Sequence, residues 1–319
     1  MTSLPPRPRT RPALLTAAMT VLAWTGGAFL TAPAFAGSTA QTEVEAEQVD
    51  VSSKLQPGET FRYSIRSRQV RQRQKPDESI IKWINRRAAL ISCEVLEPDP
   101  KIGPRVRVTF DELNITVMTP DRARRFTSAS KYANTLGAPM TLAMEPIVGA
   151  EITLTLDETG EIRRIEGADR LLKEKELRQY AEHIVGDEAI RQMIGPIFHS
   201  LARPSGDRES EPWTSTRRME FPEIATFDFT ERWLLKRREA GRATFQITSD
   251  TVATIDEHWP KAVLKDSRTI GSYTWDELTG RLVHTEINRF YIVELENDPD
   301  GPSIAGEEVL TISAPLGED

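Results

Sequence analysis

The chain has 319 residues, of which 39% are hydrophobic, enough for one large β domain or two smaller ones. Its formal net charge of −7 argues against a nucleic-acid partner, because phosphate recognition needs clustered basic residues. The only cysteine, Cys93, excludes an intramolecular disulfide, and its apolar surroundings predict a buried, inert thiol.

Residues 1–36 are predicted to be a cleavable signal peptide. Three arginines precede an apolar stretch from Ala13 to Leu30, and Ala34-Phe35-Ala36 supplies a small-x-small cleavage site. An uncleaved membrane anchor is the alternative, but Gly26 and Gly27 interrupt the apolar stretch. We therefore expect an exported chain, periplasmic or extracellular, with no stable membrane span after cleavage. Loss of the three arginines makes its net charge −10.

The ordered part of the chain is expected to begin after an acidic leader. Residues 37–54 are polar and lack apolar periodicity, so they are predicted to be disordered. Pro57-Gly58 marks a turn, followed by strand-like alternation through Phe61 and Tyr63. A β-rich domain is therefore predicted over residues 55–319.

Two further strand patterns follow in the first half of this domain. The apolar residues of 106–110 and of 113–117 alternate with opposite parity, which predicts a β-bulge or tight turn at Asp111-Glu112. Alternation over 152–156 runs into Asp157-Glu158-Thr159-Gly160. This predicts a hairpin with glycine at the position that requires a positive φ.

In the middle of the chain the apolar residues change to helical spacing. The residues at this spacing are Leu177, Tyr180, Ala181 and Ile184. They predict an amphipathic helix near 168–185, ended by Gly186. A second helix is expected from Asp187, with Gly195-Pro196 kinking or ending it. The whole helical segment is placed at 167–203.

After Trp213 the apolar period returns to two. The residues that share one face of the first strand are Phe227, Phe229, Trp233 and Leu235, interrupted only by Glu231. A second hairpin turn is predicted at 276–280, and the strand that follows has one apolar face with Arg289 as its exception. A final strand is expected near 309–312.

Together these patterns predict an α+β fold that is mainly β. We expect a curved antiparallel sheet, half-barrel-like, packed on two or three central helices. One continuous sheet and two β-rich halves, 55–166 and 213–312, are both compatible with the pattern. The similar hairpins at 154–162 and 273–282 favour a repeat, whereas common turn chemistry explains the likeness equally well.

The order of these features resembles a family of exported bacterial β-rich proteins. The likeness extends over most of residues 55–295 and includes Pro57-Gly58, the strand at 106–117, the apolar segment from Ala138 to Gly149, and Trp213. That family has no established activity, so the resemblance implies none. The architecture is also similar to half-barrels of the lipoprotein-localisation-factor type, where a curved sheet encloses an apolar cavity. This second likeness rests on no motif and is an analogy of fold.

The sequence contains no motif for catalysis, metal binding or cofactor binding. The four histidines form no His-x-His or His-x-x-x-His pair, and neither a nucleophile elbow nor a phosphate-binding glycine loop occurs. We expect no catalytic residue, no metal and no cofactor. A hydrolase built from carboxylates that folding brings together is a third-ranked alternative.

One non-strand segment, Pro139 to Val148, is unusually apolar and contains two methionines, which suit adaptable contacts. It is either a lid over a cavity or a short helix that fills one end of the core. The expected cavity residues are Met140, Leu142, Met144, Phe227, Phe229, Trp233, Tyr273 and Trp275.

The leading functional hypothesis is non-catalytic binding of an apolar small molecule or lipid in that cavity. The competing hypothesis is an envelope protein that contacts a protein partner through its surface or through a sheet edge.

Overall fold

The computed structural model describes residues 49, 52–74, 79–130, 133–198, 212–221, 225–255, 262–295 and 304–315. Within these residues twelve strands form one antiparallel sheet. The strands are β1 (Thr60–Gln74), β2 (Ile80–Asp99), β3 (Gly103–Met118), β4 (Ala123–Thr127), β5 (Glu151–Leu156), β6 (Ile162–Glu166), β7 (Trp213–Phe221), β8 (Ala225–Glu239), β9 (Arg242–Ile255), β10 (Ala262–Asp276), β11 (Arg281–Leu295) and β12 (Ile304–Ser313). The predicted class, α+β and mainly β with a curved antiparallel sheet, is confirmed.

The strand order shows how the two parts of the chain share this sheet. The order is β6-β5-β3-β2-β1-β12-β11-β10-β9-β8-β7, with β4 paired to β3. The strands up to β6 therefore run from the middle to one edge, and those from β7 run from the other edge back to the middle. The two series meet where β1 pairs with β12, with Ser64 opposite Ser313.

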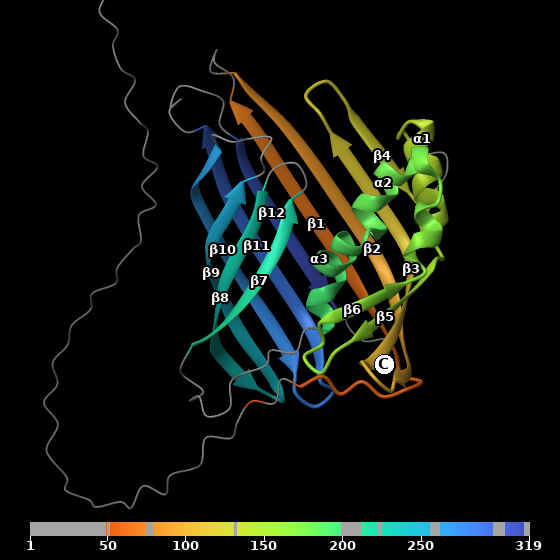
Figure 1. Cartoon of the computed structure of the whole chain (residues 1–319), viewed down its shortest axis with the longest axis vertical. Helices are drawn as coiled ribbons and strands as arrows, with labels where there is room; N and C mark the ends of the chain where they lie inside the picture. The colour runs from red at the N-terminus through yellow and green to blue at the C-terminus, as the bar shows by residue number, and fades with distance from the viewer. Residues whose placement is uncertain are drawn as a thin grey trace, which may run out of the picture. The chain divides into compact units, whose positions relative to one another are not determined.

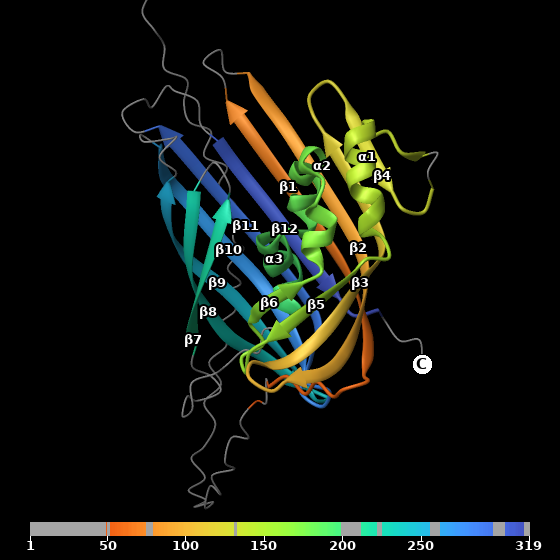
Figure 2. The same ribbon diagram turned by 45° about the vertical axis from the view of Figure 1, so that its right-hand side comes forward.

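Helices lie against the concave face of the sheet (Figures 1 and 2). They are α1 (Ala138–Met144), α2 (Lys175–Val185) and α3 (Asp187–Phe198), with the short 3₁₀ helices η2 (Glu145–Ile147) and η3 (Ala168–Leu172). Both α2 and α3 belong to the connection from β6 at one sheet edge to β7 at the other. This connection therefore passes over the concave face.

The predicted bulge is confirmed in β3. Leu90 lies opposite Glu112 and Ile91 lies opposite Phe110, so Asp111 is the extra residue. The part of β3 before the bulge pairs with β5, and the part after it pairs with β4. The bulge thus marks the point at which β3 changes partner.

Both predicted hairpins are present, and an aspartate organises each turn. Gly160 has a φ of 77° and Gly280 a φ of 63°, the left-handed conformation that glycine adopts without strain. The Asp157 carboxylate accepts from the backbone N–H of Thr159 at 2.8 Å. Asp276 accepts from the backbone N–H of Leu278 at 2.9 Å in the same way.

The two main helices also follow the prediction, with one difference. Gly186 ends α2 as expected, and a Cβ there would lie only 2.4 Å from the carbonyl oxygen of Glu182, so the tight junction needs glycine. In contrast, α3 does not end at Gly195-Pro196 but continues to Phe198, the last residue described before 212. Residues 199–203 of the predicted helical segment lie outside the described residues.

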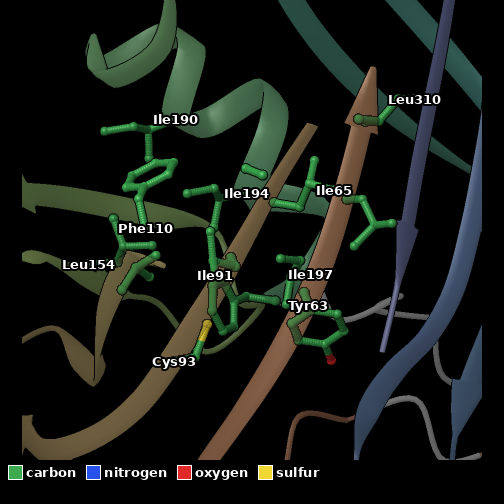
Figure 3. Packing of buried hydrophobic residues seen from close by; sticks show 14 of the residues in the cluster. Tyr63, Ile65, Ile91, Cys93, Phe110, Leu154, Ile190, Ile194, Ile197 and Leu310 are labelled. Atoms are coloured by element: carbon green, nitrogen blue, oxygen red, sulfur yellow. The ribbon is translucent and has the colours of Figure 1, made fainter. Parts of the chain in front are cut away.

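One face of α3 packs on the hydrophobic core of the concave face. Figure 3 shows Ile190, Ile194 and Ile197 of α3 among side chains from the sheet. The labelled partners are Tyr63, Ile65, Ile91, Cys93, Phe110, Leu154 and Leu310, which come from β1, β2, β3, β5 and β12. Because the isoleucines occupy one face of α3, its opposite face is available for other contacts.

The predicted signal peptide, 1–36, lies outside the described residues and stays a prediction. Of the predicted leader, the structure describes residues 49 and 52–54. Lys54 donates from Nζ to the carbonyl oxygen of Glu277 at 2.7 Å, and Val49 is 4% exposed. None of the helices in the described part of the chain is long and apolar enough to cross a membrane.

Candidate ligand-binding cavity

A cavity of about 300 Å³ opens between α3, the turn from β5 to β6, and the concave face of the sheet. This volume is at the lower end of the range for small-molecule sites. The sheet residues that line it come from β6, β7, β8, β10 and β11, and they are Ile162, Ser215, Thr216, Glu231, Trp233, Tyr273 and Ile287.

Two aromatic side chains form one wall of this cavity. Trp233 of β8 and Tyr273 of β10 meet edge to face, with ring centres 5.6 Å apart, and Trp275 stacks on Tyr273 at 6.0 Å. Trp233 donates from Nε1 to Ser215 Oγ at 2.9 Å, and the Tyr273 hydroxyl donates to the carbonyl oxygen of Pro196 at 3.0 Å. Both rings are therefore held by hydrogen bonds to other elements. Burial raises the pKa of Tyr273 well above its ordinary value, so its hydroxyl remains a donor.

The opposite wall is the face of α3 that turns away from the isoleucine core. Glu188, Arg191, Gln192 and Gly195 follow one another at helical spacing, and all four line the cavity. Gln192 donates from Nε2 to Glu188 at 2.7 Å. Arg191 donates from Nη1 to the carbonyl oxygen of Ile162 in β6, which joins α3 to the edge strand.

Glu231 is the exception in the apolar face of β8, and it lies in the cavity wall. The residue is only 6% exposed. Across the described residues its carboxylate takes part in no hydrogen bond or ion pair. Ser215 lies directly opposite on β7, and Ser249 lies opposite on β9.

A row of polar residues, here called the polar row, continues from Glu231 across the concave face. Paired residues of an antiparallel sheet share a face, so the register places them in line. In order along the sheet they are Glu231, Ser249, Thr269, Arg289, Glu308, Gln69 and Asn85. Arg289 lies 3.3 Å from Glu308, and Gln69 donates to Glu308 at 3.1 Å. Among the described side chains, Ser249 Oγ, Arg289 Nη2 and Asn85 Oδ1 are buried without a hydrogen-bond partner.

The residues predicted to line a cavity fall into two groups. Trp233 and Tyr273 line the observed cavity, and Trp275 is fully buried behind Tyr273. Phe229 precedes Glu231 on the same face of β8 and is 6% exposed. Phe227 lies on β8 opposite Ala253, and its side chain is outside the description.

The methionine segment lies elsewhere, in α1 and η2, which pack against α2 rather than against the cavity. Met144 is 2% exposed and belongs to the core, Met140 packs on the rim of that core, and Leu142 is 55% exposed. The structure therefore does not bring this segment together with the aromatic wall.

The sequence patterns did not identify the cavity-lining residues of α3, and they identified only some of those on β8. Arg191, Gln192 and Gly195 lie on the polar side of an amphipathic helix, which usually faces water, so their spacing carried no signal. Glu231 and Arg289 did carry one, because each interrupts an otherwise apolar strand face. The described residues include no group of three or more His, Cys, Asp or Glu side chains that could hold a metal ion.

No protein-family model and no curated protein sequence matches the chain. A structure of lipovitellin that describes its lipid–protein interactions matches at 13% identity and a TM-score of 0.45, covering 83% of this chain and 26% of that one. This chain thus spans about a quarter of the lipovitellin chain. DynF from the dynemicin pathway of Micromonospora chersina matches at 8% identity and a TM-score of 0.21, covering 89% of this chain and 95% of that one.

A LolA superfamily protein from Nitrosomonas europaea matches at 9% identity and a TM-score of 0.13, covering 86% of this chain and 93% of that one. At this level of similarity the matches carry no information about function. The predicted resemblance to an exported bacterial family likewise stays a prediction.

Proposed function

We propose that this chain is an exported, non-catalytic protein that binds a small apolar or amphipathic molecule in the cavity between α3 and the concave face. The observation that supports this most directly is the aromatic wall of Trp233 and Tyr273. The polar atoms of both side chains bond to the protein, so they contribute mainly ring surface to the cavity. Burial of apolar surface is the main driving force for binding in such pockets.

The cavity walls are also fixed before any ligand arrives. The bond from Tyr273 to Pro196 ties α3 to β10, and the bond from Trp233 to Ser215 ties β8 to β7. A site that is already ordered avoids much of the entropy cost of binding. This rigidity favours a binding protein that holds one kind of ligand.

Gly195 provides a direct test, because it lines the cavity without a side chain. A Cβ built there would meet only Ile162 Cδ1, at 4.0 Å. Gly195→Ala should therefore fit, whereas the longer side chain of Gly195→Leu should extend into the cavity. Alanine and leucine are better helix formers than glycine by up to about 1 kcal/mol, but a Cβ next to Pro196 disfavours helical backbone at this position. Both variants share this cost, so Gly195→Ala is the matched control for Gly195→Leu.

The test combines extraction with titration on the full chain. Protein purified without detergent is extracted with organic solvent for mass spectrometry, and a neutral fluorescent naphthylamine probe is titrated against each variant. The wild type and Gly195→Ala should bind the probe, and Gly195→Leu should bind about tenfold more weakly with the same urea midpoint as Gly195→Ala. An empty extract together with no probe binding by the wild type would refute the proposal. Equal binding by Gly195→Leu would place the site elsewhere.

The alternative of a sheet edge offered to a partner strand has less support. The edge strand β6 has five residues, of which Arg163, Arg164 and Glu166 are charged, and the other edge strand, β7, also contains three charged residues. Short, charged edge strands are a common protection against pairing with another chain. Cavity binding is therefore the function with the better structural support.

Export is the part of the proposal that rests on the sequence of residues 1–36. Mass spectrometry of the protein recovered from the periplasm or the culture medium should give a chain that begins at Gly37. A chain that keeps residues 1–36 and stays in the cytoplasm would contradict export while leaving the binding proposal intact.

A further inference from the structure

We propose that the molecule held in this cavity carries a positively charged amine beside its apolar part, an inference that rests on the proposed function. The observation is the carboxylate of Glu231, which lines the cavity although the residue is only 6% exposed. A buried carboxylate is costly unless a cation or several donors accompany it. Within the described part of the chain, the Glu231 carboxylate has neither a cationic partner nor a hydrogen-bond donor.

The arginine of the cavity wall and the arginine of the polar row are both bonded to groups other than Glu231. Arg191 lines the same cavity, but its Nη1 donates to the carbonyl oxygen of Ile162. Arg289 belongs to the polar row and forms its ion pair with Glu308, with 3.3 Å between Nη1 and Oε2. Within the described residues neither guanidinium forms an ion pair with Glu231, so a ligand cation is the partner that this carboxylate lacks.

The other charged residues of the cavity wall also favour a positively charged ligand. Its charged lining residues are Glu161, Glu188, Glu231 and Arg191, three carboxylates and one guanidinium. Glu161 already has an ion pair, at 3.0 Å with Arg163. The excess of carboxylates attracts a cation and disfavours an anion such as a fatty-acid carboxylate.

The aromatic wall suits the same group. Trp233 lies two residues after Glu231 on the same face of β8, about 6.6 Å along the strand. A cation that contacts the carboxylate is therefore close enough for attraction to the indole ring, which acts within about 6 Å of the ring centre. A carboxylate beside a tryptophan ring is a favourable environment for a primary or a quaternary ammonium group.

The apolar part of the ligand then has its own surface in the same cavity. Ile287 of β11 and the ring of Tyr273 line the wall beside Trp233. The ligand class that fits is a hydrophobic amine, with its ammonium at Glu231 and its hydrocarbon against Tyr273 and Ile287.

Three probes of equal chain length test the sign of the preferred charge. Decyltrimethylammonium, decanol and decanoate are titrated calorimetrically into the full chain at pH 7, below their aggregation concentrations. The wild type should bind the ammonium about tenfold more tightly than the alcohol, and the carboxylate most weakly. This comparison needs no variant and so does not depend on any mutant folding.

Glu231→Gln then locates the preference. Glutamine keeps the size and removes the charge, so affinity for decyltrimethylammonium should fall to that for decanol, while decanol binding is unchanged. Glu307→Gln, on β12 outside the cavity lining and paired with Arg68, is the matched control and should keep the preference. Equal affinities for the three probes, or a preference that survives Glu231→Gln, would overturn this inference. If none of the probes binds, the proposed function itself fails.

Discussion

The hydroxyl of Tyr273 on β10 donates a hydrogen bond to the carbonyl oxygen of Pro196 on α3, with 3.0 Å between the two oxygens. The two residues are 77 positions apart in the sequence. Pro196 lies in α3, two residues before Phe198, the last described residue of that helix. Tyr273 therefore provides a donor to the α3 backbone and ties that helix to β10.

Tyr273→Phe should lower the free energy of unfolding by about 1–3 kcal/mol, because the buried Pro196 carbonyl loses its donor. Urea unfolding followed by circular dichroism measures this. Tyr63→Phe is the matched control, since the Tyr63 hydroxyl makes a similar buried bond to the carbonyl oxygen of Leu282 at 2.8 Å. We expect similar losses of stability but weaker probe binding only for Tyr273→Phe. Unchanged probe binding by both variants would exclude a positioning role for Tyr273.

Neighbouring glutamates on β12 allow a comparison of buried and exposed ion pairs. Glu308 and Arg289 are 3.3 Å apart with side chains 12% and 6% exposed. Glu307 and Arg68 are also 3.3 Å apart, but their side chains are 47% and 39% exposed. Arg289→Met should cost about 3–5 kcal/mol because it leaves a buried carboxylate unpaired, and Arg68→Met about 0–1 kcal/mol. Denaturant unfolding distinguishes the two, and equal costs would contradict the assignment of Glu308 to the interior.

The methionine segment can be tested with one buried and one exposed position of α1. Met144→Asp places a charge in the core and should prevent folding or cost several kcal/mol, because Met144 is 2% exposed. Leu142→Asp, at 55% exposure, should change stability by no more than about 0.5 kcal/mol. Thermal unfolding and probe titration give both readouts. Reduced probe uptake in a folded Leu142→Asp variant would support the lid hypothesis instead.

Cys93 should be unreactive in the folded protein. Its side chain is 1% exposed, and burial raises the pKa of the thiol far above the ordinary value, so the nucleophilic thiolate does not form. Ellman's reagent should modify Cys93 only above the urea midpoint, and raising the pH from 7 to 9 should not accelerate labelling of the native state. Rapid native-state labelling would show that the core around β2 opens locally.

Local chemistry was sufficient to predict much of the fold. The aspartates and glycines of the two hairpins, and the change of apolar parity around Asp111, act over a few residues, so the sequence shows them directly. Helix boundaries were also close, because Gly186 permits an approach to Glu182 that no other residue allows. These features depend on short-range sterics and hydrogen bonding.

The site was harder to predict because it depends on contacts between distant segments. Glu231 and Arg289 each appear as an isolated polar exception in an apolar strand, and only the register between strands shows that they share one row. Gly195 is an ordinary helical glycine until α3 is placed over the sheet. The proline-bracketed methionines suggested a lid, whereas the hydrophobic effect placed Met144 in the core between α1 and the sheet.

The position of β12 between β1 and β11 has a consequence for the order in which the molecule can assemble. During synthesis β1 appears early, yet its second neighbour is made only after almost all the rest of the sheet. Until then β1 and β11 both present unpaired edges, which are prone to pairing with the wrong chain. The sheet can therefore be completed only late, after synthesis of β12, and a chain interrupted before Ile304 would keep two open edges in the middle of its fold.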